Sequence, residues 1–329
     1  DLARWPLDLG GQPLDFPGLL RRVAGFAGLL HVAVGTFMPL VLVAMMTRIT
    51  RGSFRQGLRA WRFALLAGLA YTVPSALTAL LVGSELPALL GALVGLSVCV
   101  PAIRRGILVP RESWDFPARD RWPRAWEGAV AAGQGPDDDT APPMHPLRAW
   151  SPYLAIGLLL LAGRVPQLGI SPLLESVTIG WTGILGTTIG ETIEPLYNPG
   201  VVPFVLVAAV IPWLHGLDRR EAWRTVGETL RLMGSAAVAL VFTLGMVYLM
   251  MNTGGDGERG SMLIVLAEAA AGLAGDVWLA VAPHVGILGT FISGSNTVSN
   301  LMFGPFQFDT AYQAGVPLVA TLALQAVGG

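Results

Sequence analysis

Charged side chains are scarce in this sequence of 329 residues. Asp, Glu, Lys and Arg together make up 13% of the chain, whereas hydrophobic residues make up 53%. Soluble domains contain about 25% charged residues, and the mean hydropathy of +0.59 points the same way. The deficit of charge excludes an ordinary soluble protein of this length and predicts a chain that crosses a membrane several times.

Cysteine, lysine and histidine are also rare. The single cysteine, Cys99, lies in an apolar segment, so an intrachain disulfide and a cluster of thiolate metal ligands are both excluded. All 21 basic residues are arginine, and the formal net charge is −1, which gives no general attraction to nucleic acid. The four histidines form no His-Glu-x-x-His motif. We therefore expect no metal centre, no cofactor and no nucleic-acid partner.

Apolar runs that approach the roughly 20 residues of a membrane-spanning helix recur along the chain. Helix is the expected state, because strands of a membrane barrel would alternate polar and apolar residues. The predicted spans and broken elements are Val23–Met46, Phe63–Val82 with a kink at Pro74, Leu86–Ile103, Ala149–Gly163, Val201–Leu214, Leu232–Met251, Ser261–Ala282, His284–Phe303 and Val316–Val327. The mixed segment Val165–Pro199 is expected to form an even number of crossings or a re-entrant pair.

Arginine is concentrated in three connections between these spans, which orients the predicted topology. They are residues 47–62, the long loop after Ile103, and residues 215–231. We expect all three to be cytoplasmic, and the arginine-poor connections at Gly83–Glu85 and Asn252–Gly260 to face the other side. The three aspartates within Gln134–Pro143 are interpreted as part of a solvated loop rather than as a cation site.

The run Phe291–Phe303, Phe-Ile-Ser-Gly-Ser-Asn-Thr-Val-Ser-Asn-Leu-Met-Phe, is polar within membrane-like sequence. Upstream of it lies the apolar stretch Val277–Ile292. Downstream, Gly304 and Pro305 are expected to end the helix that the run begins. Irregular backbone at membrane depth persists only where it is buried in protein or lines a cavity, and transporters place their substrates at such breaks. The run therefore predicts a substrate site.

The residue types in this run favour an anion. Ser295 or Asn296 is suited to cap a helix that begins at Thr297, and the unpaired amides of that helix would present partial positive charge. Polar side chains three and four residues apart share a face, which forms a neutral cradle rich in hydrogen-bond donors. The predicted substrate-binding residues are Ser293, Gly294, Ser295, Asn296, Thr297 and Asn300. The alternative is that small polar residues only hold helices together in the membrane.

Four stretches resemble one known family. Gly294–Phe303, followed by Phe306-Gln-Phe308, is similar to the signature of the lactate permease family. Gly83–Pro87 resembles its Gly-Pro-Glu-Leu-Pro element with serine in place of the first proline, and Leu147–Pro152 resembles its Leu-Arg-Ala-Trp-Thr/Ser-Pro element. Leu324–Gly329 resembles a piece that precedes another polar break. The resemblance extends from about Arg22 to the end of the chain.

The resemblance implies an all-α, polytopic membrane helix bundle with broken or re-entrant helices, built as an inverted-repeat secondary transporter. By analogy, residues 1–102 are the end of the first repeat, 103–148 a cytoplasmic connector, and 149–329 the second repeat, truncated at its C-terminus. The family's Glu-Gly-Ala-Ala-Gly-Phe-Gly element does not occur in this sequence. We therefore expect an internal piece that holds half of the site and needs the N- and C-terminal segments of its own full-length chain.

The family's members resemble bacterial inner-membrane symporters that import L-lactate, glycolate and related 2-hydroxy monocarboxylates with protons. The implied partners are such a carboxylate, protons and the lipid bilayer. Proton coupling requires a titratable group near the site, and ionisable residues within a membrane are candidates by default. Asp309 is the first candidate, and Glu191 and Glu194 follow. Weaker candidates are Glu268, Asp276, His31 and His284.

Three alternatives are weighed against this hypothesis. The first is a sodium-coupled carrier, or a carrier of another organic anion, with the same architecture. The second is an intramembrane enzyme, for which the sequence offers no catalytic motif. The third is a channel, for which no ring-forming charged filter is visible.

Overall fold

The computed structural model describes residues 15–110, 116, 122, 144–164, 168–183, 186, 190–198, 200–253 and 261–329. Most of the predicted connector 103–148, including the three aspartates within Gln134–Pro143, lies outside these residues. The chain separates into two compact units, Asp1–Phe116 with Ser235–Gly329, and Pro117–Gly234. This grouping differs from the predicted division at residues 102 and 149, and the assignment of repeats stays a prediction.

Five helices and one 3₁₀ turn form the N-terminal part of the first unit. They are α1 (Phe16–Ala33), η2 (Gly35–Phe37), α2 (Met38–Arg51), α3 (Phe54–Leu58), α4 (Trp61–Leu81) and α5 (Pro87–Arg104). The predicted spans Phe63–Val82 and Leu86–Ile103 are thus confirmed to within two residues. Pro74 lies inside α4 as expected, and the hydroxyl of Thr78 donates to its carbonyl oxygen at 2.8 Å.

The predicted span Val23–Met46 is not one straight helix, because the chain bends by 43° between α1 and the following η2–α2 segment. The bend packs against α4. There Thr36 and Thr72 form a buried hydroxyl–hydroxyl hydrogen bond of 2.9 Å. A Cβ atom on Gly68 would collide with the carbonyl of Thr36, so glycine is what allows this close approach. Backbone contact and a buried hydrogen bond together hold the bend.

Arg21 is an exception to the predicted arginine pattern, because it lies at the end of the bundle where basic residues are otherwise few. Its Nη2 donates to the carbonyl oxygens of Leu80 and Leu81, both at 3.2 Å. These carbonyls belong to the last turn of α4, where no intrahelical donor is left. Arg21 therefore caps a neighbouring helix, which also shows that the start of α1 lies beside the end of α4.

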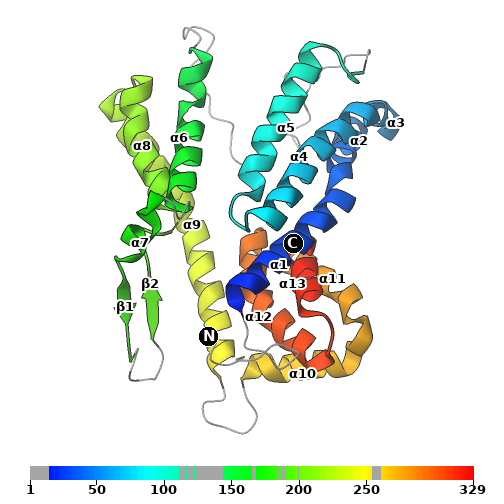
Figure 1. Ribbon diagram of the computed structural model, residues 1–329, viewed down its shortest axis with the longest axis vertical. Helices are drawn as coiled ribbons and strands as arrows, with labels where there is room; N and C mark the ends of the chain where they lie inside the picture. The colour runs from blue at the N-terminus through cyan, green and yellow to red at the C-terminus, as the bar shows by residue number, and fades with distance from the viewer. Residues whose placement is uncertain are drawn as a thin grey trace. The chain divides into compact units, whose positions relative to one another are not determined.

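The C-terminal part of the first unit consists of α10 (Met262–Ala274), η8 (Gly275–Val277), α11 (Trp278–Ser293), α12 (Asn296–Ala314) and α13 (Leu318–Gly328). Helix α12 packs against α10, α11 and α13, and α13 also packs against α1, as Figure 1 shows for the red and blue helices. Trp278, Ala282, Ala311 and Val316 form a buried cluster among them.

Two predicted boundaries in this part are wrong. The expected division between spans at Pro283 does not occur, because Pro283 and His284 lie inside α11. The expected stop at Gly304 and Pro305 does not occur either, because α12 continues to Ala314 with Pro305 in its interior. Neighbouring helices can compensate the backbone groups that a proline frees inside a membrane protein. The predicted element Val316–Val327 is confirmed as α13 within two residues.

The second unit contains α6 (Pro146–Arg164), α7 (Ile170–Glu175), strands β1 (Ile179–Trp181) and β2 (Glu191–Ile193), and α8 (Val202–His215). The strands pair antiparallel, with Gly180 opposite Thr192. The all-α prediction therefore misses a small hairpin. The described part of Val165–Pro199 forms α7 and this hairpin instead of the expected pair of crossings. Arg148 Nε donates to Leu214 O at 2.6 Å and so joins α6 to the end of α8.

Helix α9 (Arg219–Asn252) has 34 residues. At 1.5 Å per residue it is about 50 Å long, which exceeds the roughly 30 Å hydrocarbon core of a bilayer. The predicted span Leu232–Met251 corresponds to its C-terminal part. Its N-terminal turns carry an exposed ion pair, Arg224 with Glu228 at 3.5 Å. The prediction underestimated the length of this helix, because hydropathy does not detect its polar N-terminal turns.

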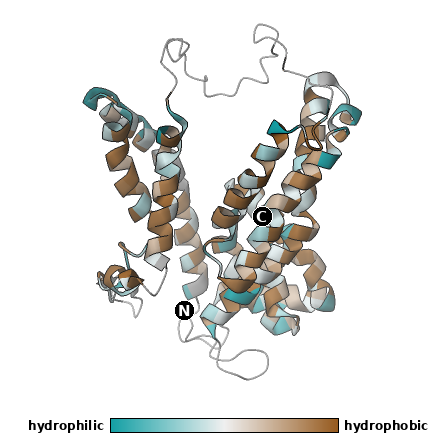
Figure 2. Ribbon diagram, turned by 45° about the horizontal axis from the view of Figure 1, so that its top comes forward, coloured by the Kyte–Doolittle hydropathy of each residue, from teal (hydrophilic) through white to brown (hydrophobic). Residues whose placement is uncertain are grey.

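Several polar side chains are buried, and many large apolar side chains are exposed, in the described part of this molecule. Among the described residues, the largest fully buried side chains are Gln307, Gln325, Thr47, Thr310, Thr321 and Ser299. Leucine and phenylalanine side chains are outside, with Leu273 90% and Phe291 86% exposed. Figure 2 shows hydrophobic colour along the helices and hydrophilic colour at their ends. Three described helical segments are long and apolar enough to span a membrane, or four if the bent pair is one span.

The contact between α4 and the bend yields a prediction. Gly68→Ala should destabilise the full-length protein in detergent by about 1–3 kcal/mol, because overpacking outweighs the gain in helix propensity. Gly234→Ala is the control, since a Cβ there meets nothing within 4 Å. Thermal unfolding midpoints measure both. Equal midpoints for the two variants would contradict the close contact at Thr36.

Candidate functional site

The predicted interruption of the polar run is confirmed. Helix α11 ends at Ser293, Gly294 adopts a left-handed conformation with φ of 69°, and α12 begins at Asn296. Ser295 is extended, and its side chain accepts a hydrogen bond from Val298 N at 3.4 Å. The prediction of Ser295 as a cap is therefore correct, with the helix starting one residue earlier than expected. A glycine is needed here because other residues rarely adopt positive φ.

The predicted stripe of polar side chains is only partly correct. Ser293 belongs to α11, where its hydroxyl donates to Gly289 O at 2.7 Å, so it does not continue the face of α12. Asn296 and Asn300 do share a face, and Asn300 Nδ2 donates to Asn296 Oδ1 at 3.0 Å. Asn296 Nδ2 in turn donates to the carbonyl oxygen of Ala326 on α13 at 3.0 Å. The two amides are thus oriented by each other and by α13.

Gln307 is the centre of a buried polar network that joins α11, α12 and α13. Its Oε1 accepts a hydrogen bond from Trp278 Nε1 at 2.8 Å. Its Nε2 donates to Ala282 O at 3.0 Å and to Gln325 Oε1 at 2.9 Å. Every polar atom of this side chain, which is fully buried, therefore has a partner.

Gln325 connects this network to the break. Its Nε2 donates to Ser299 Oγ at 3.2 Å, and it lies 3.5 Å from Asn300 Oδ1. Ser299 donates to Gly286 O at 3.0 Å. The side chains thus form a continuous path from the tryptophan on α11 to the asparagines at the start of α12. Inside a low-dielectric core such a chain of hydrogen bonds rigidifies the groups that it connects.

The network was missed from the sequence, although a signal was present. Gln307 and Gln325 lie in two of the stretches that carry the family resemblance, Phe306-Gln-Phe308 and Leu324–Gly329. Each is an uncharged polar residue with apolar neighbours in the sequence, and Gln325 lies in the predicted element Val316–Val327. Such a residue must find a hydrogen-bond partner inside the protein. The sequence therefore predicts a buried hydrogen bond at each glutamine, although it does not identify the partner.

The three helices approach closely at glycines. A Cβ on Gly289 would collide with Ser299 Oγ, and a Cβ on Gly328 would collide with Pro283 O. Small residues at such positions let helix backbones meet in membranes. The close approach brings the start of α12, the end of α11 and the end of α13 together around Asn296.

Thr290, one turn before the end of α11, adds an unusual observation. Its hydroxyl oxygen is buried and has no hydrogen-bond partner in the described part of the chain. A Cβ built on Gly329 would approach both this oxygen, at 2.7 Å, and Asn296 Oδ1. An unpaired buried hydroxyl is rare and calls for an explanation such as a bound ligand. Unsatisfied hydrogen-bonding capacity therefore exists beside the predicted site.

The proton-coupling candidates lie in different places. Asp309 is on α12 and is 2% exposed, so its carboxyl group is enclosed by the helices of the first unit. Glu194 is exposed in the turn after β2, and Glu191 lies in β2 opposite Trp181. These two glutamates belong to the second unit and form no part of the α11–α12 break. Their assignment to coupling, like that of Asp309, stays a prediction.

The weaker titratable candidates are all exposed within the described chain: His31, Glu268, Asp276 and His284. His284 Nδ1 lies 2.9 Å from Ala280 O, one turn earlier in α11. The structure brings none of the four into the glutamine network. Asp309 is thus the one candidate whose carboxyl group is buried on the same helix as Asn296.

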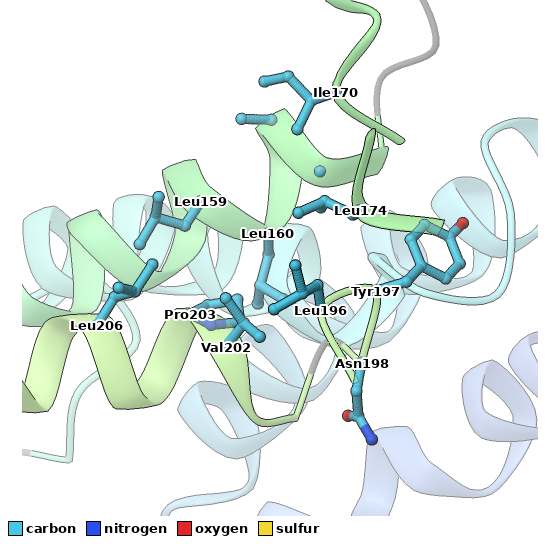
Figure 3. Close-up of a pocket in the computed structure, with 12 residues that line it drawn as sticks. Leu159, Leu160, Ile170, Leu174, Leu196, Tyr197, Asn198, Val202, Pro203 and Leu206 are labelled. Carbon is cyan, nitrogen blue, oxygen red and sulfur yellow. The ribbon is translucent and has the colours of Figure 1, made fainter. Parts of the chain in front are cut away.

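A pocket in the second unit is less suited to a carboxylate. It lies among α6, α7 and α8, and leucine side chains such as Leu160, Leu174 and Leu196 converge on it (Figure 3). Asn198 is at its edge, where its Oδ1 accepts a hydrogen bond from Gly200 N at 2.9 Å. An apolar lining offers nothing to offset the desolvation of an anion. The break between α11 and α12 is the better candidate site.

Chemically, the break can bind a small anion without a fixed positive charge. The first intrahelical bond of α12 runs from Ser299 N to Ser295 O. The amides of Asn296 and Thr297 precede this bond and point along the helix dipole. Thr297 and Asn296 are exposed, and Asn300 is half-buried. The arrangement combines backbone amides, side-chain amides and the unpaired Thr290 hydroxyl on one side of a broken helix.

The family model of the L-lactate permeases matches residues 6–329. The chain belongs to the L-lactate permease family. Its members are transporters, not enzymes, so the intramembrane enzyme is excluded. The chain is 25% identical to the L-lactate permease of Bacillus subtilis, with 90% of this chain aligned to 54% of that protein. No solved structure matches the chain.

Two further relatives support the same family. The glycolate permease of Escherichia coli is 24% identical, with 94% of this chain aligned to 56% of that protein. The L-lactate permease of Streptococcus iniae is 23% identical, with 75% of this chain aligned to 46% of that protein. The chain spans about half the length of the relatives that it matches.

The network predicts a specific weakness of this lactate permease chain. Gln307→Leu removes the partners of Trp278 Nε1 and Gln325 Oε1 and should destabilise the full-length protein by about 1–3 kcal/mol. Gln313→Leu, on the exposed face of the same helix, should change stability by less than about 0.5 kcal/mol. Unfolding midpoints in detergent measure the difference. A Gln307→Leu variant as stable as Gln313→Leu would show that the network does not hold the helices.

Proposed function

We propose that the full-length protein is a secondary carrier that imports L-lactate, or a related 2-hydroxy monocarboxylate such as glycolate, together with protons across the bacterial inner membrane. The observation that carries the proposal is the break at Gly294 and Ser295, which opens a helix N-terminus inside a bundle of apolar helices. Membership of the lactate permease family supports the substrate class, because relatives are named for lactate and for glycolate.

The substrate carboxylate is proposed to bind at the start of α12. Its oxygens accept hydrogen bonds from the amides of Asn296 and Thr297, where the helix dipole favours negative charge. The 2-hydroxyl group donates to Asn296 Oδ1 or to the unpaired Thr290 oxygen. The predicted set Ser293, Gly294, Ser295, Asn296, Thr297 and Asn300 is kept in this proposal, with Ser293 and Ser295 shaping the break rather than touching the substrate.

The buried network gives this site its rigidity. Gln325 and Ala326 hold Asn300 and Asn296 from the side of α13, so their amide groups keep one orientation before substrate arrives. A preorganised site spends less free energy on ordering its side chains when the ligand binds. Segments of the full-length protein outside this chain are proposed to supply the opposite wall, in the inverted-repeat arrangement expected for such carriers.

Asp309 is proposed to carry the coupled proton. An ionisable side chain within a membrane-spanning bundle is a candidate for function, and Asp309 is buried on the same helix as Asn296. Glu191 and Glu194 remain secondary proposals. Transport of a monocarboxylate with one proton moves no net charge, which suits a site built from neutral amides.

A sodium-coupled carrier, or a carrier of another organic anion, is the second candidate. Uptake of labelled lactate into vesicles containing the full-length protein separates the two. Under the proposal, a proton gradient directed into the vesicles drives accumulation of lactate. An uncoupler abolishes this accumulation, and sodium has no effect on it. Accumulation that requires sodium and resists the uncoupler would reject proton coupling, and uptake of another anion but not lactate would reject the substrate class.

The asparagine pair provides the first functional prediction. Asn296→Ala and Asn300→Ala should each raise the KM for lactate uptake by about tenfold, because each removes a hydrogen bond worth roughly 1 kcal/mol or more from the site. Asn252→Ala is the control, since Asn252 is exposed at the end of α9 and bonds only Tyr248 O in the described chain. Wild-type kinetics in both site variants would place the substrate elsewhere.

Asp309 provides the second functional prediction. Asp309→Asn should abolish accumulation driven by a pH gradient while leaving exchange of labelled for unlabelled lactate, because exchange needs no net proton movement. Asp276→Asn, at an exposed position before α11, should leave both activities unchanged. Retained gradient-driven uptake in Asp309→Asn would assign the proton to another group. Unfolding midpoints of both variants show whether loss of accumulation reflects loss of fold.

A further inference from the structure

One end of the first unit carries a dense set of arginines. Helices α4 and α5 are antiparallel neighbours joined by a short turn, so the start of α4 and the end of α5 lie together, and α2 and α3 lead into the same end (Figure 1). The exposed arginines there are Arg48, Arg55, Arg59, Arg62, Arg104 and Arg105. We refer to these six residues and their neighbours as the arginine-rich end.

The sequence stretches that form the arginine-rich end contain no acidic residue. Residues 38–84 and 86–110 contain no aspartate and no glutamate. The acidic Asp15 and Glu85 lie at the opposite end of α4, as the contact of Arg21 with Leu80 O establishes. Helix α4 has 21 residues, and at 1.5 Å per residue the two ends are about 30 Å apart. That distance equals the thickness of the hydrocarbon core, which puts the arginines at the level of the headgroups.

Exposed apolar side chains alternate with these arginines. Phe54 is 51% exposed, Trp61 48% and Ile103 54%. The guanidinium of Arg48 lies 5.8 Å from the ring centre of Phe54, and that of Arg62 lies 5.4 Å from the ring centre of Trp61. Aromatic rings prefer the interface of a membrane. The surface therefore presents rings suited to the acyl boundary beside cations suited to phosphate.

We propose that the arginine-rich end is a binding site for anionic phospholipid headgroups. Guanidinium groups bind phosphate through paired, charge-assisted hydrogen bonds. A cluster of four or more arginines next to a membrane span attracts anionic lipid, and each arginine adds to this attraction. The lipid site is separate from the proposed transport site. Charge complementarity favours this lipid over zwitterionic lipid, and the exposed rings favour a lipid over a soluble phosphate.

The N-terminal turns of α9 offer a matched comparison. They also carry four arginines, Arg219, Arg220, Arg224 and Arg231, but acidic residues are interleaved with them. Arg224 pairs with Glu228 at 3.5 Å. Arginines compensated by neighbouring acidic residues should bind anionic lipid more weakly, which separates a true site from a general effect of arginine.

The test uses the full-length protein in a neutral detergent at low salt, with labelled phosphatidylglycerol and labelled phosphatidylcholine as probes. The wild type should bind phosphatidylglycerol at least about tenfold more tightly, and high salt should remove the preference. The variant Arg55→Gln, Arg62→Gln, Arg104→Gln, Arg105→Gln should lose about tenfold or more in affinity for phosphatidylglycerol alone. The corresponding α9 variant, with Arg219, Arg220, Arg224 and Arg231 changed to Gln, should stay within about twofold of wild type.

Several results would overturn the proposal. They are equal binding of the two lipids, an unchanged preference in the variant of the arginine-rich end, an equal loss in the α9 variant, or displacement of the lipid by millimolar inorganic phosphate. Arg→Lys at the same four positions keeps the charge and should keep the preference. If the four-residue variant does not fold, the pair Arg104→Gln and Arg105→Gln should still lower affinity by about threefold or more, and an unchanged affinity would reject the site.

Discussion

The bilayer interior contains no water, and every polar group placed there needs a partner within the protein. This constraint explains why the molecule buries glutamine, threonine and serine and exposes leucine and phenylalanine. Gln307 shows the principle most completely, since its amide joins three helices through Trp278, Ala282 and Gln325. Apolar contacts provide little preference for protein over lipid, so hydrogen bonds and close backbone packing decide which helices associate.

The same constraint makes a broken helix costly and therefore informative. At Gly294 the chain forgoes backbone hydrogen bonds that a continuous helix would have made. The surrounding groups recover some of them, through the Ser295 cap and the bond from Gly294 N to Thr290 O at 2.7 Å. Within the described chain, the unpaired Thr290 hydroxyl lies beside Asn296. Under the proposed function, the backbone hydrogen bonds lost at the break leave donors for the substrate.

Local patterns in the sequence predicted the elements that depend on local chemistry. The spans corresponding to α4 and α5, the break after Ser293 and the capping role of Ser295 follow from hydropathy and residue type, and all are confirmed. Features that depend on distant partners were not predictable in this way. The bend before α2 relies on Thr72 and Gly68, and the continuation of α12 through Pro305 relies on its neighbours. The bond between Gln307 and Gln325 joins residues 18 positions apart on different helices.

The glycines that bring α11 and α13 together have a mechanical consequence. Gly286 faces the carbonyl of Gln325, and Gly328 faces that of Pro283, so the two backbones touch at two points within about one turn of each helix. Helices engaged in this way cannot slide along each other, because any shift in register would drive a side chain into the opposite backbone. Under the proposed function, these two helices therefore move as one rigid body during transport.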